Sequence, residues 1–238
     1  KDYLKKKIIK LLINLTYPLS NKIITNSKGI KNGFNKTLKS KIKVIYPPAI
    51  EKILKPKKIT KIPKSFKAVC FSRLSIEKNL ECAIKSFSFL KNNNISLTIY
   101  GNGNLKEKLY TLTNILSLKN KILFKKHTKN AKKEIKKFDI LISPSFFEGC
   151  SNSIIEAINH DLIVVASNCP GGNKEILSIG NSGELFITND EYDLSHKIKK
   201  VINNFIHYRY KNRINRHKLK NFLQSNNVRE YTKIFRSI

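Results

Sequence analysis

The chain has 238 residues, enough for one large or two small domains, and its 40% hydrophobic and 9% aromatic content excludes an intrinsically disordered protein. It carries 47 lysines and arginines against 16 acidic residues, a formal net charge of +31. This charge could serve an anionic membrane surface, an anionic substrate or nucleic acid, or simply reflect an AT-rich coding sequence. Because the lysines are spread along the whole chain, we do not expect nucleic acid as a partner.

The first 50 residues differ in pattern from the rest. Residues 5–15 mix lysines with apolar residues and predict an amphipathic helix that is buried on one face. The run KIITNS (22–27) is followed by a short predicted helix around 28–38 and by the run KVIYPP (43–48). The chain begins with lysine and contains no methionine, so we expect it to be the later part of a longer protein.

After a lysine- and proline-rich linker at 51–65, β-branched runs alternate with helical patterns. Strands are predicted at 68–72, 96–100, 121–125, 139–143 and 162–167. Helices are predicted between them at 77–91, 104–118, 131–137 and 152–160. Such alternation predicts an α/β fold with a Rossmann-like parallel sheet and helices on both faces. From about Glu191 the pattern is helical throughout, which predicts a helical C-terminal tail.

Four cysteines, with no C-x-x-C pair and no histidines at metal-ligand spacing, favour a reduced, cytoplasmic protein over a disulfide or zinc framework. They are Cys70, Cys82, Cys150 and Cys169. No apolar run of the sequence approaches the roughly 18 residues needed to span a bilayer.

The segment SPSFFEGCSNSIIEA holds two glutamates, Glu148 and Glu156, across a predicted strand–loop–helix junction. Gly149 permits a sharp turn there, and Ser151 or Asn152 can cap the following helix. In open α/β sheets ligands bind at the carboxyl ends of the strands, beside helix N-termini that favour anions. We therefore expect carboxylates that accept sugar or ribose hydroxyls and N–H groups that hold a phosphate.

Three further loops join a predicted strand to a predicted helix. FSRLSIEKN contains Arg73 and Lys78, which could hold a diphosphate or belong to an ordinary basic loop. YGNGN contains Gly101 and Gly103, which permit a close ligand approach or form a plain turn, and the third glycine of the dinucleotide fingerprint is missing. CPGGNKEIL is a tight turn or a ligand loop, and its Glu175 opens the next helix. The sequence has no D-x-D, G-x-S-x-G or P-loop motif.

The chain resembles the family 4 (group 1) glycosyltransferases of the GT-B fold in the order and spacing of ITNSKGIKNGF, KVIYPPAI, FSRLSIEKN, LTIYGNGNLKEKL, DILISPSFFEGCSNSIIEA, LIVVASNCPGGNKEIL and GELF. The resemblance covers residues 20–187 approximately. It implies a donor-binding C-terminal half with closing helices at 66–238, and a remnant of the N-terminal acceptor domain at 1–50. The implied activity is retaining, metal-independent transfer of a hexose from a nucleotide sugar, with UDP expected ahead of GDP, to a lipid-linked or envelope polysaccharide acceptor.

The resemblance also implies roles for individual residues. Arg73 and Lys78 would neutralise the departing diphosphate, and Glu148 would bind the donor sugar, so these three form the expected catalytic set. The expected nucleotide-sugar-binding residues are Glu156, on the ribose, with Gly101, Gly103, Gly149, Cys150, Ser151, Asn152 and Ser153. No metal and no cofactor is implied. Two departures from the family pattern are Ser72 and Lys126, which stand where relatives usually have glycine.

Three functions therefore remain open. The chain could be the donor-binding half of an active enzyme whose acceptor domain is encoded upstream or separately, or a non-catalytic remnant that keeps nucleotide binding. It could also be a basic module that binds nucleic acid or a membrane surface, but the retained site residues favour the first function over this one. The expected location is the cytoplasm, with peripheral contact at the anionic inner face of the plasma membrane.

Overall fold

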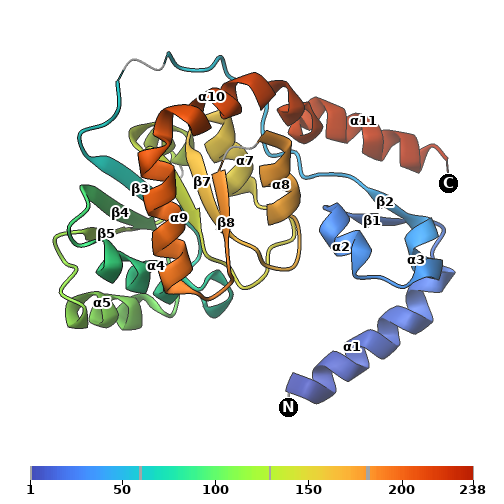
Figure 1. Cartoon of the computed structure of the whole chain (residues 1–238). Coiled ribbons are helices and arrows are strands. Elements are labelled where there is room, and N and C mark those ends of the chain that lie inside the picture. The colour runs from blue at the N-terminus through green and yellow to red at the C-terminus, as the bar shows by residue number, and fades with distance from the viewer. Residues whose placement is uncertain (1, 59–60, 129, 181–182, 238) are drawn as a thin grey trace.

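A six-stranded parallel sheet forms the centre of the computed structural model, which describes residues 2–58, 61–128, 130–180 and 183–237 (Figure 1). Its strand order is β5-β4-β3-β6-β7-β8. The strands are β3 (Phe66–Phe71), β4 (Ile95–Tyr100), β5 (Ile122–Lys125), β6 (Ile140–Ser143), β7 (Ile163–Ser167) and β8 (Gly183–Phe186). All five pairings are parallel, which confirms the predicted Rossmann-like sheet.

Both faces of the sheet are covered by helices. Strands β6 and β7 read ILIS and IVVAS and are buried at every position, as expected for strands without a solvent face. Ala68 and Cys70 pack into one hydrophobic cluster, with α4 (Leu80–Ser86), α5 (Lys106–Ile115) and α9 (Glu191–Asn203). The intervening Val69 packs into a second cluster, with α7 (Asn152–Asn159) and α8 (Asn173–Gly180) on the opposite face.

Most predicted elements are present, although the helices predicted at 28–38, 77–91 and 131–137 are each divided into shorter ones. The predicted helix at 77–91 is divided into η2 (Ile76–Lys78), α4 and η3 (Phe87–Leu90). Asn79, which adopts a left-handed conformation with φ of 47°, separates η2 from α4. Strand β8 was not predicted as a strand, since it is a four-residue edge strand in which only Phe186 is buried. The predicted helical tail is confirmed. It consists of α9, α10 (Phe205–Asn215), η5 (Arg216–Phe222) and α11 (Gln224–Phe235).

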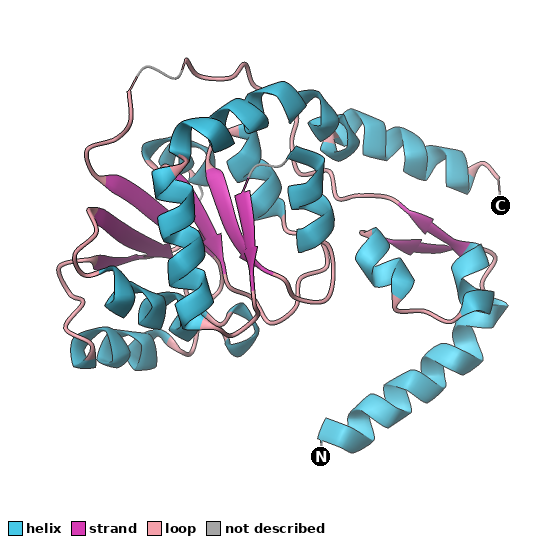
Figure 2. Ribbon diagram, in the orientation of Figure 1, coloured by secondary structure: helices cyan, strands magenta, loops and turns pink. Residues whose placement is uncertain are grey.

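The first fifty residues form a separate small unit beside the main sheet (Figure 2). It comprises α1 (Asp2–Thr16), η1 (Tyr17–Leu19), β1 (Ile23–Thr25), α2 (Lys28–Asn32), α3 (Lys36–Lys41) and β2 (Ile42–Val44). Strands β1 and β2 pair in parallel as a two-stranded sheet. The predicted linker contains neither helix nor strand at 51–58 and 61–65.

Helix α1 corrects one expectation. The helix itself was predicted, but its apolar face is not buried, because α1 projects away from the rest of the chain (Figure 1). Six of its apolar side chains are between 48% and 62% exposed: Leu4, Ile8, Ile9, Leu11, Leu12 and Leu15. No helix in the described part of the chain has both the length and the apolar content to cross a membrane.

A buried arginine in the tail fixes the C-terminal end of α7. Arg216, 5% exposed, donates from Nη1 to the backbone carbonyls of Leu54 and Asn159 at 2.9 and 2.8 Å. Its Nη2 donates to the carbonyl of Ile158 at 3.3 Å and pairs with the carboxylate of Asp161, which is 3% exposed. The guanidinium thus joins the linker, the end of α7 and the tail, and it satisfies carbonyls that a helix end leaves without partners.

Replacement of Arg216 by alanine should lower the free energy of unfolding by about 3–5 kcal/mol, because Asp161 would stay buried without its partner. Chemical denaturation measures this change. Lys43→Ala is the control, since it breaks an exposed ion pair with Glu230 (2.9 Å) and should leave the midpoint close to that of the unsubstituted protein. Equal effects of the two substitutions would contradict this assignment.

Candidate active site

The candidate site lies where the loops after β3 and β6 leave the sheet. These strands are neighbours, but the chain continues from β3 toward β4 and β5 and from β6 toward β7 and β8. At such a switch point the two loops diverge and leave a crevice at the carboxyl ends of the strands. The loop after β3 carries Arg73 and Lys78, and the loop after β6 carries Glu148.

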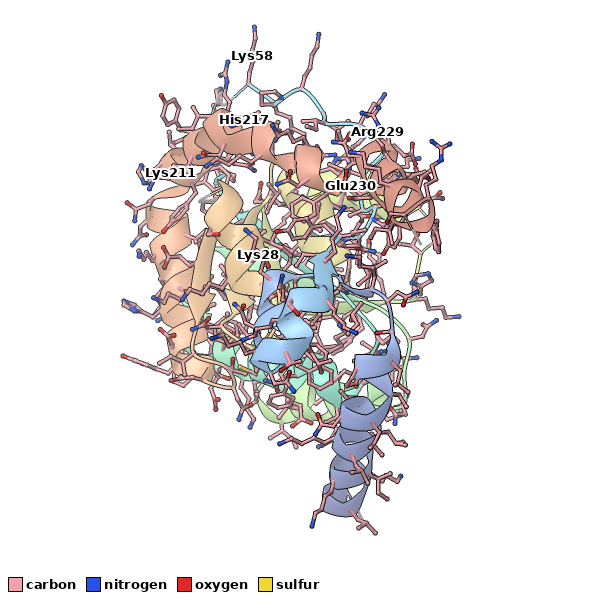
Figure 3. The ribbon with its side chains drawn as sticks, turned by 90° about the vertical axis from the view of Figure 1, so that its right-hand side faces the viewer. Lys28, Lys58, Lys211, His217, Arg229 and Glu230 are labelled. Carbon is pink, nitrogen blue, oxygen red and sulfur yellow. The ribbon has the colours of Figure 1, made fainter. Side chains whose placement is uncertain are left out.

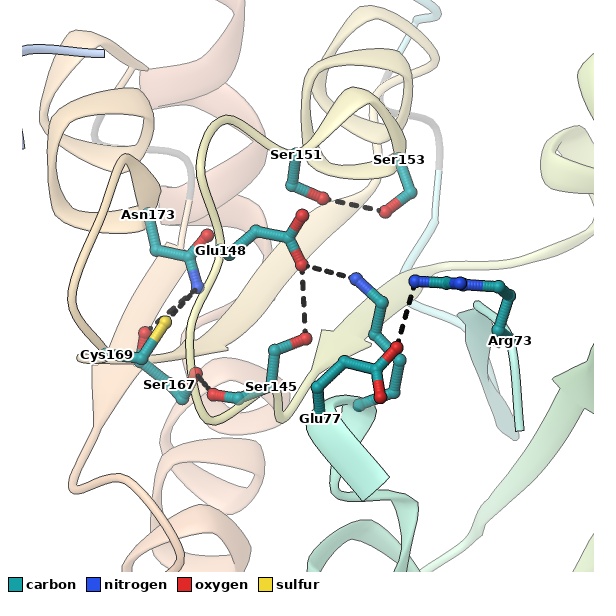
Figure 4. Close-up of polar contacts among 10 residues, drawn as sticks. Arg73, Glu77, Ser145, Glu148, Ser151, Ser153, Ser167, Cys169 and Asn173 are labelled. Carbon is teal, nitrogen blue, oxygen red and sulfur yellow. Dashed lines mark hydrogen bonds and ion pairs between the residues drawn. The ribbon is translucent and has the colours of Figure 1, made fainter. Parts of the chain in front are cut away.

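Lys78 and Glu148 form an ion pair in this crevice (Figure 4). Lys78 Nζ lies 2.7 Å from Glu148 Oε2, and the two side chains are 20% and 16% exposed. The hydroxyl of Ser145 donates to the same oxygen at 3.2 Å. The structure thus brings together two residues that the sequence singled out 70 positions apart.

Arg73 belongs to the same loop as Lys78 but points elsewhere. Its Nη2 donates to Glu77 Oε1 at 2.9 Å, and its side chain is 77% exposed (Figure 4). Glu77 was missed in the sequence, although its i,i+4 spacing from Arg73 is typical of an ion pair. An exposed guanidinium held by one exchangeable partner can reorient toward an anion in the crevice.

The turn CPGGNKEIL supports the backbone of Glu148. The Glu148 N–H donates to the carbonyl of Pro170 at 3.2 Å, and the Gly172 N–H donates to the carbonyl of Glu148 at 2.9 Å. Gly171 has φ of +124°, and a Cβ atom there would lie 1.7 Å from the Glu148 carbonyl oxygen. This role could not be predicted from the sequence, which indicated only a turn or a ligand loop.

Helix α7 points its N-terminus into the loop that carries Glu148. Ser151 occupies the N-cap position as predicted, but its hydroxyl contacts Ser153 Oγ at 3.0 Å instead of capping a backbone N–H. The first N–H that bonds within the helix is that of Ile155, to the carbonyl of Ser151 at 3.2 Å. The preceding N–H groups, including that of Asn152, are the ones that a helix presents to an anion.

Gly149 and Cys150 precede this helix. Burial, followed by the charges of Glu175 and Glu148, raises the pKa of the Cys150 thiol to about 12 and keeps it neutral. Cys150 is therefore suited to contact a ligand through its backbone N–H group and not through a thiolate. All four cysteines are buried and free. The described residues contain no group of three His, Cys, Asp or Glu that could hold a metal ion.

Gly101 and Gly103 have a packing role that the sequence did not reveal. The loop after β3 runs along the loop after β4, with the Leu74 N–H donating to the carbonyl of Asn102 at 2.9 Å. A Cβ atom on Gly101 would lie 1.9 Å from Ser72 O, and one on Gly103 would lie 2.3 Å from Leu74 O. Both glycines therefore permit the loop that carries Arg73 to lie against its neighbour.

Two cavities are lined by other residues that the sequence singled out, and helix α6 (Ala131–Glu134) borders both. A cavity of about 310 Å³ is lined by Arg73, Gly101 and residues including Tyr100, His127 and Ala131. A second, of about 190 Å³, is lined by Glu156 with residues including Ile50, Lys132 and His160. Burial raises the pKa of Glu156 above its usual value, against the opposing charge of Lys132. Glu156 therefore lines a different cavity from Arg73. The two cavities are neighbours, because Ala131 and Lys132, successive residues of α6, line one each.

Comparison with known proteins decides the family. Residues 51–225 match the sequence profile of the glycosyl transferases group 1. The chain belongs to this family. The predicted family and its GT-B fold are therefore confirmed, and the six-stranded sheet with its helical tail is the C-terminal half of that fold.

Curated relatives of this glycosyltransferase chain are longer than the chain itself. An uncharacterised glycosyltransferase of Methanocaldococcus jannaschii is 33% identical over 193 residues, which are 74% of this chain and 47% of the relative. An N-acetylgalactosamine-N,N'-diacetylbacillosaminyl-diphospho-undecaprenol 4-alpha-N-acetylgalactosaminyltransferase of Campylobacter jejuni is 28% identical over 207 residues, 85% of this chain and 56% of that protein. The chain thus spans about half the length of these relatives.

Solved structures of glycosyltransferases share the fold. Anabaena HepE in complex with UDP and glucose matches with a TM-score of 0.83 and 18% identity, covering 96% of this chain and 66% of that one. A mutant of Staphylococcus aureus TarM in complex with UDP matches with a TM-score of 0.73 and 22% identity, covering 90% and 44%.

Gly171→Ala should destabilise this glycosyltransferase chain by about 1–3 kcal/mol, because alanine is strained at φ of +124° and its Cβ meets the Glu148 carbonyl. Thermal and chemical denaturation report the change. Gly33→Ala is the matched control, since Gly33 has φ of −74° and its Cβ would lie 3.3 Å from Ile30 O. If the Gly171 substitution is as mild as the control, the support role of this turn is wrong.

Glu156→Gln should stabilise the chain at neutral pH. A carboxyl whose pKa is raised on folding binds its proton more tightly in the folded state, so stability falls as pH rises through the interval between the unfolded and folded pKa values. The advantage of the glutamine variant should therefore be full at pH 7 and vanish below about pH 4, the usual range of an unfolded glutamate. Melting curves across this pH range test it, with Glu107→Gln on the exposed side of α5 as the control for a lost charge. A stability difference that does not vary with pH would contradict the expectation.

Proposed function

We propose that this chain is the donor-binding half of a retaining, metal-independent glycosyltransferase that transfers a hexose from a nucleotide sugar. Residues 66–238 would form the donor-binding domain, 51–65 the linker, and 1–50 the end of the acceptor domain. The observation that carries the proposal is the Lys78–Glu148 pair, set in the crevice between β3 and β6 beside the N-terminus of α7. Retention of configuration is proposed from the family resemblance alone.

The site supplies positive charge where a departing diphosphate would need it. Lys78, the exposed Arg73 and the N–H groups at Asn152 and Ser153 would hold the diphosphate and stabilise its developing charge, which is the role a metal ion has in other transferases. Glu148 would accept hydrogen bonds from the hydroxyls of the donor sugar. As an ion-pair partner it also keeps Lys78 in place until a phosphate arrives.

The two cavities provide room for the nucleoside. Glu156 would accept the ribose hydroxyls, and the cavity of about 310 Å³ beside Tyr100 and His127 would take the base. Gly101 lines that cavity, and Gly103 would lie close to the nucleotide by the family resemblance. Uridine is the proposed base because the Anabaena and S. aureus proteins were solved with UDP.

The acceptor is proposed to be a lipid-linked or envelope saccharide, since the Campylobacter relative is named for an undecaprenol-linked acceptor. Turnover would require an acceptor lobe beside this chain. Two features of the first fifty residues support this: the apolar face of α1 is exposed, and β1 and β2 form a two-stranded parallel sheet, whereas parallel sheets normally have covered faces. The net charge of +31 is compatible with work at the anionic inner face of the plasma membrane.

UDP should bind the chain, and Lys78→Ala and Arg73→Ala should each weaken that binding about tenfold or more, because each removes a charge-assisted contact with phosphate. Isothermal titration with UDP and GDP measures the effect, and a chelator should leave it unchanged. Lys119→Ala, in an exposed turn, controls for the loss of one positive charge.

The same titrations separate the other functions. Equal losses of UDP affinity in the three variants would indicate that UDP is bound by general charge attraction and not by the proposed site. Tight DNA binding with a steep salt dependence, and no UDP binding, would indicate a basic nucleic-acid module instead. Binding of UDP and UDP-sugar without transfer, even when an acceptor lobe is supplied, would indicate a non-catalytic remnant.

A further inference from the structure

Glu175 connects the main sheet unit to the first fifty residues. It lies in the first turn of α8, where its Oε2 accepts the backbone N–H of Lys28 at 2.8 Å. Figure 3 labels Lys28 at the start of α2, in the small unit that lies in front of the main sheet in that view. Its Oε1 accepts the hydroxyl of Tyr46. Burial, followed by the bond to Glu175, raises the pKa of Tyr46, so this hydroxyl stays protonated and donates. The Tyr46 ring packs edge-on against Phe222 with centroids 5.0 Å apart, which fixes its position.

Beside these bonds the two units meet backbone against backbone. A Cβ atom on Gly29 would lie 1.9 Å from the carbonyl oxygen of Gly171. A Cβ atom on Gly172 would lie 3.2 Å from Ser27 Cβ in the first unit, and 2.6 Å from the carbonyl oxygen of Gly149 within the main unit. Such approaches are possible only without side chains. The start of α2 therefore rests directly on the turn that supports Glu148.

A continuous set of contacts leads from Tyr46 to the candidate sugar contact. Tyr46 and Lys28 hold Glu175 at the end of the turn, and the turn exchanges two backbone hydrogen bonds with Glu148. Glu148 in turn pairs with Lys78 at 2.7 Å. A displacement of the first unit would therefore move the backbone of Glu148.

We propose that Glu175 and Tyr46 are positioning residues for the donor sugar: they lock the turn at 170–172 and so set the position of the Glu148 carboxylate. This inference rests on the proposed function, in which Glu148 binds the sugar. The nucleoside would be held by the two cavities, whose linings contain no residue of this turn. Of the cations proposed for the diphosphate, Arg73 lies outside these contacts, and Lys78 meets them only through the Glu148 carboxylate, which it would exchange for a phosphate when UDP binds. Loss of the lock thus weakens sugar recognition and spares recognition of UDP.

The test compares UDP with UDP-sugars on the whole chain. Tyr46→Phe removes one hydroxyl and Glu175→Ala removes both bonds, and titration calorimetry gives the affinities for UDP, UDP-glucose and UDP-N-acetylglucosamine. For the UDP-sugar that binds the unsubstituted chain more tightly, affinity should fall about five- to tenfold, the loss expected for one ordinary hydrogen bond to the sugar, with UDP affinity changed less than about twofold. Glu175→Gln, which keeps one acceptor oxygen, should recover part of the loss.

Tyr208→Phe is the matched control. It removes the same kind of tyrosine-to-glutamate bond, to Glu184, between α10 and β8. A purely structural role for Tyr46 would lower the melting temperature of both tyrosine variants and leave the ratio of UDP-sugar to UDP affinity unchanged, which would overturn the inference.

Hydrogen exchange provides a readout that needs no ligand. The amides of Glu148 and Gly172, which bond across the turn, should exchange faster in Tyr46→Phe and Glu175→Ala but not in Tyr208→Phe. Unchanged exchange at these amides would contradict the lock even if nucleotides bind. Failure of the unsubstituted chain to bind UDP would instead contradict the proposed function, whatever the exchange data show.

Discussion

The parallel pairing of β3 with β6 is the constraint on which the rest of the site depends. Because the chain leaves these neighbouring strands in opposite directions, their loops separate and open a crevice that no other neighbouring pair in this sheet has. Lys78 and Glu148 reach each other only through this pairing. The turn after β7 then lies next to the loop after β6, which is why it can support Glu148 by backbone hydrogen bonds.

The charges of the site differ in how firmly they are held. Lys78 and Glu148 are largely buried and neutralise each other, and a pair of this kind adds little net stability because desolvation offsets the attraction. Its presence in the crevice is therefore better explained by ligand binding than by folding. Arg73 is exposed and exchangeable, whereas Arg216, at the far end of α7, is buried and structural. Arg216 thus holds the C-terminal end of α7, whereas Arg73 remains accessible to solvent.

Much of the fold was accessible from sequence because its signals are local. Buried parallel strands read as short β-branched runs, and helical spacing is visible in the tail. The family resemblance singled out Lys78 and Glu148, which the structure pairs. The edge strand β8 escaped prediction because its four residues lack a buried apolar run.

Other features were not accessible, because they depend on residues that meet only after folding. The bond between Tyr46 and Glu175 joins positions 129 residues apart, and neither residue type signals the contact. Gly101 and Gly103 suggested a ligand, yet close approach of a neighbouring loop already requires glycine at both positions. The amphipathic pattern of α1 predicted the helix correctly, but the prediction that one face is buried was wrong, because a local pattern does not show whether other residues of the chain cover that face.

The exposed face of α1 has a consequence for how the chain behaves in solution. Its apolar stripe favours association with any similar surface, while a net charge of +31 drives like chains apart. The repulsion acts over a Debye length, which falls from about 30 Å at 0.01 M salt to about 8 Å at 0.15 M, whereas apolar attraction is not screened. Low ionic strength should therefore oppose self-association through α1, and added salt should shift the balance toward contact through this helix.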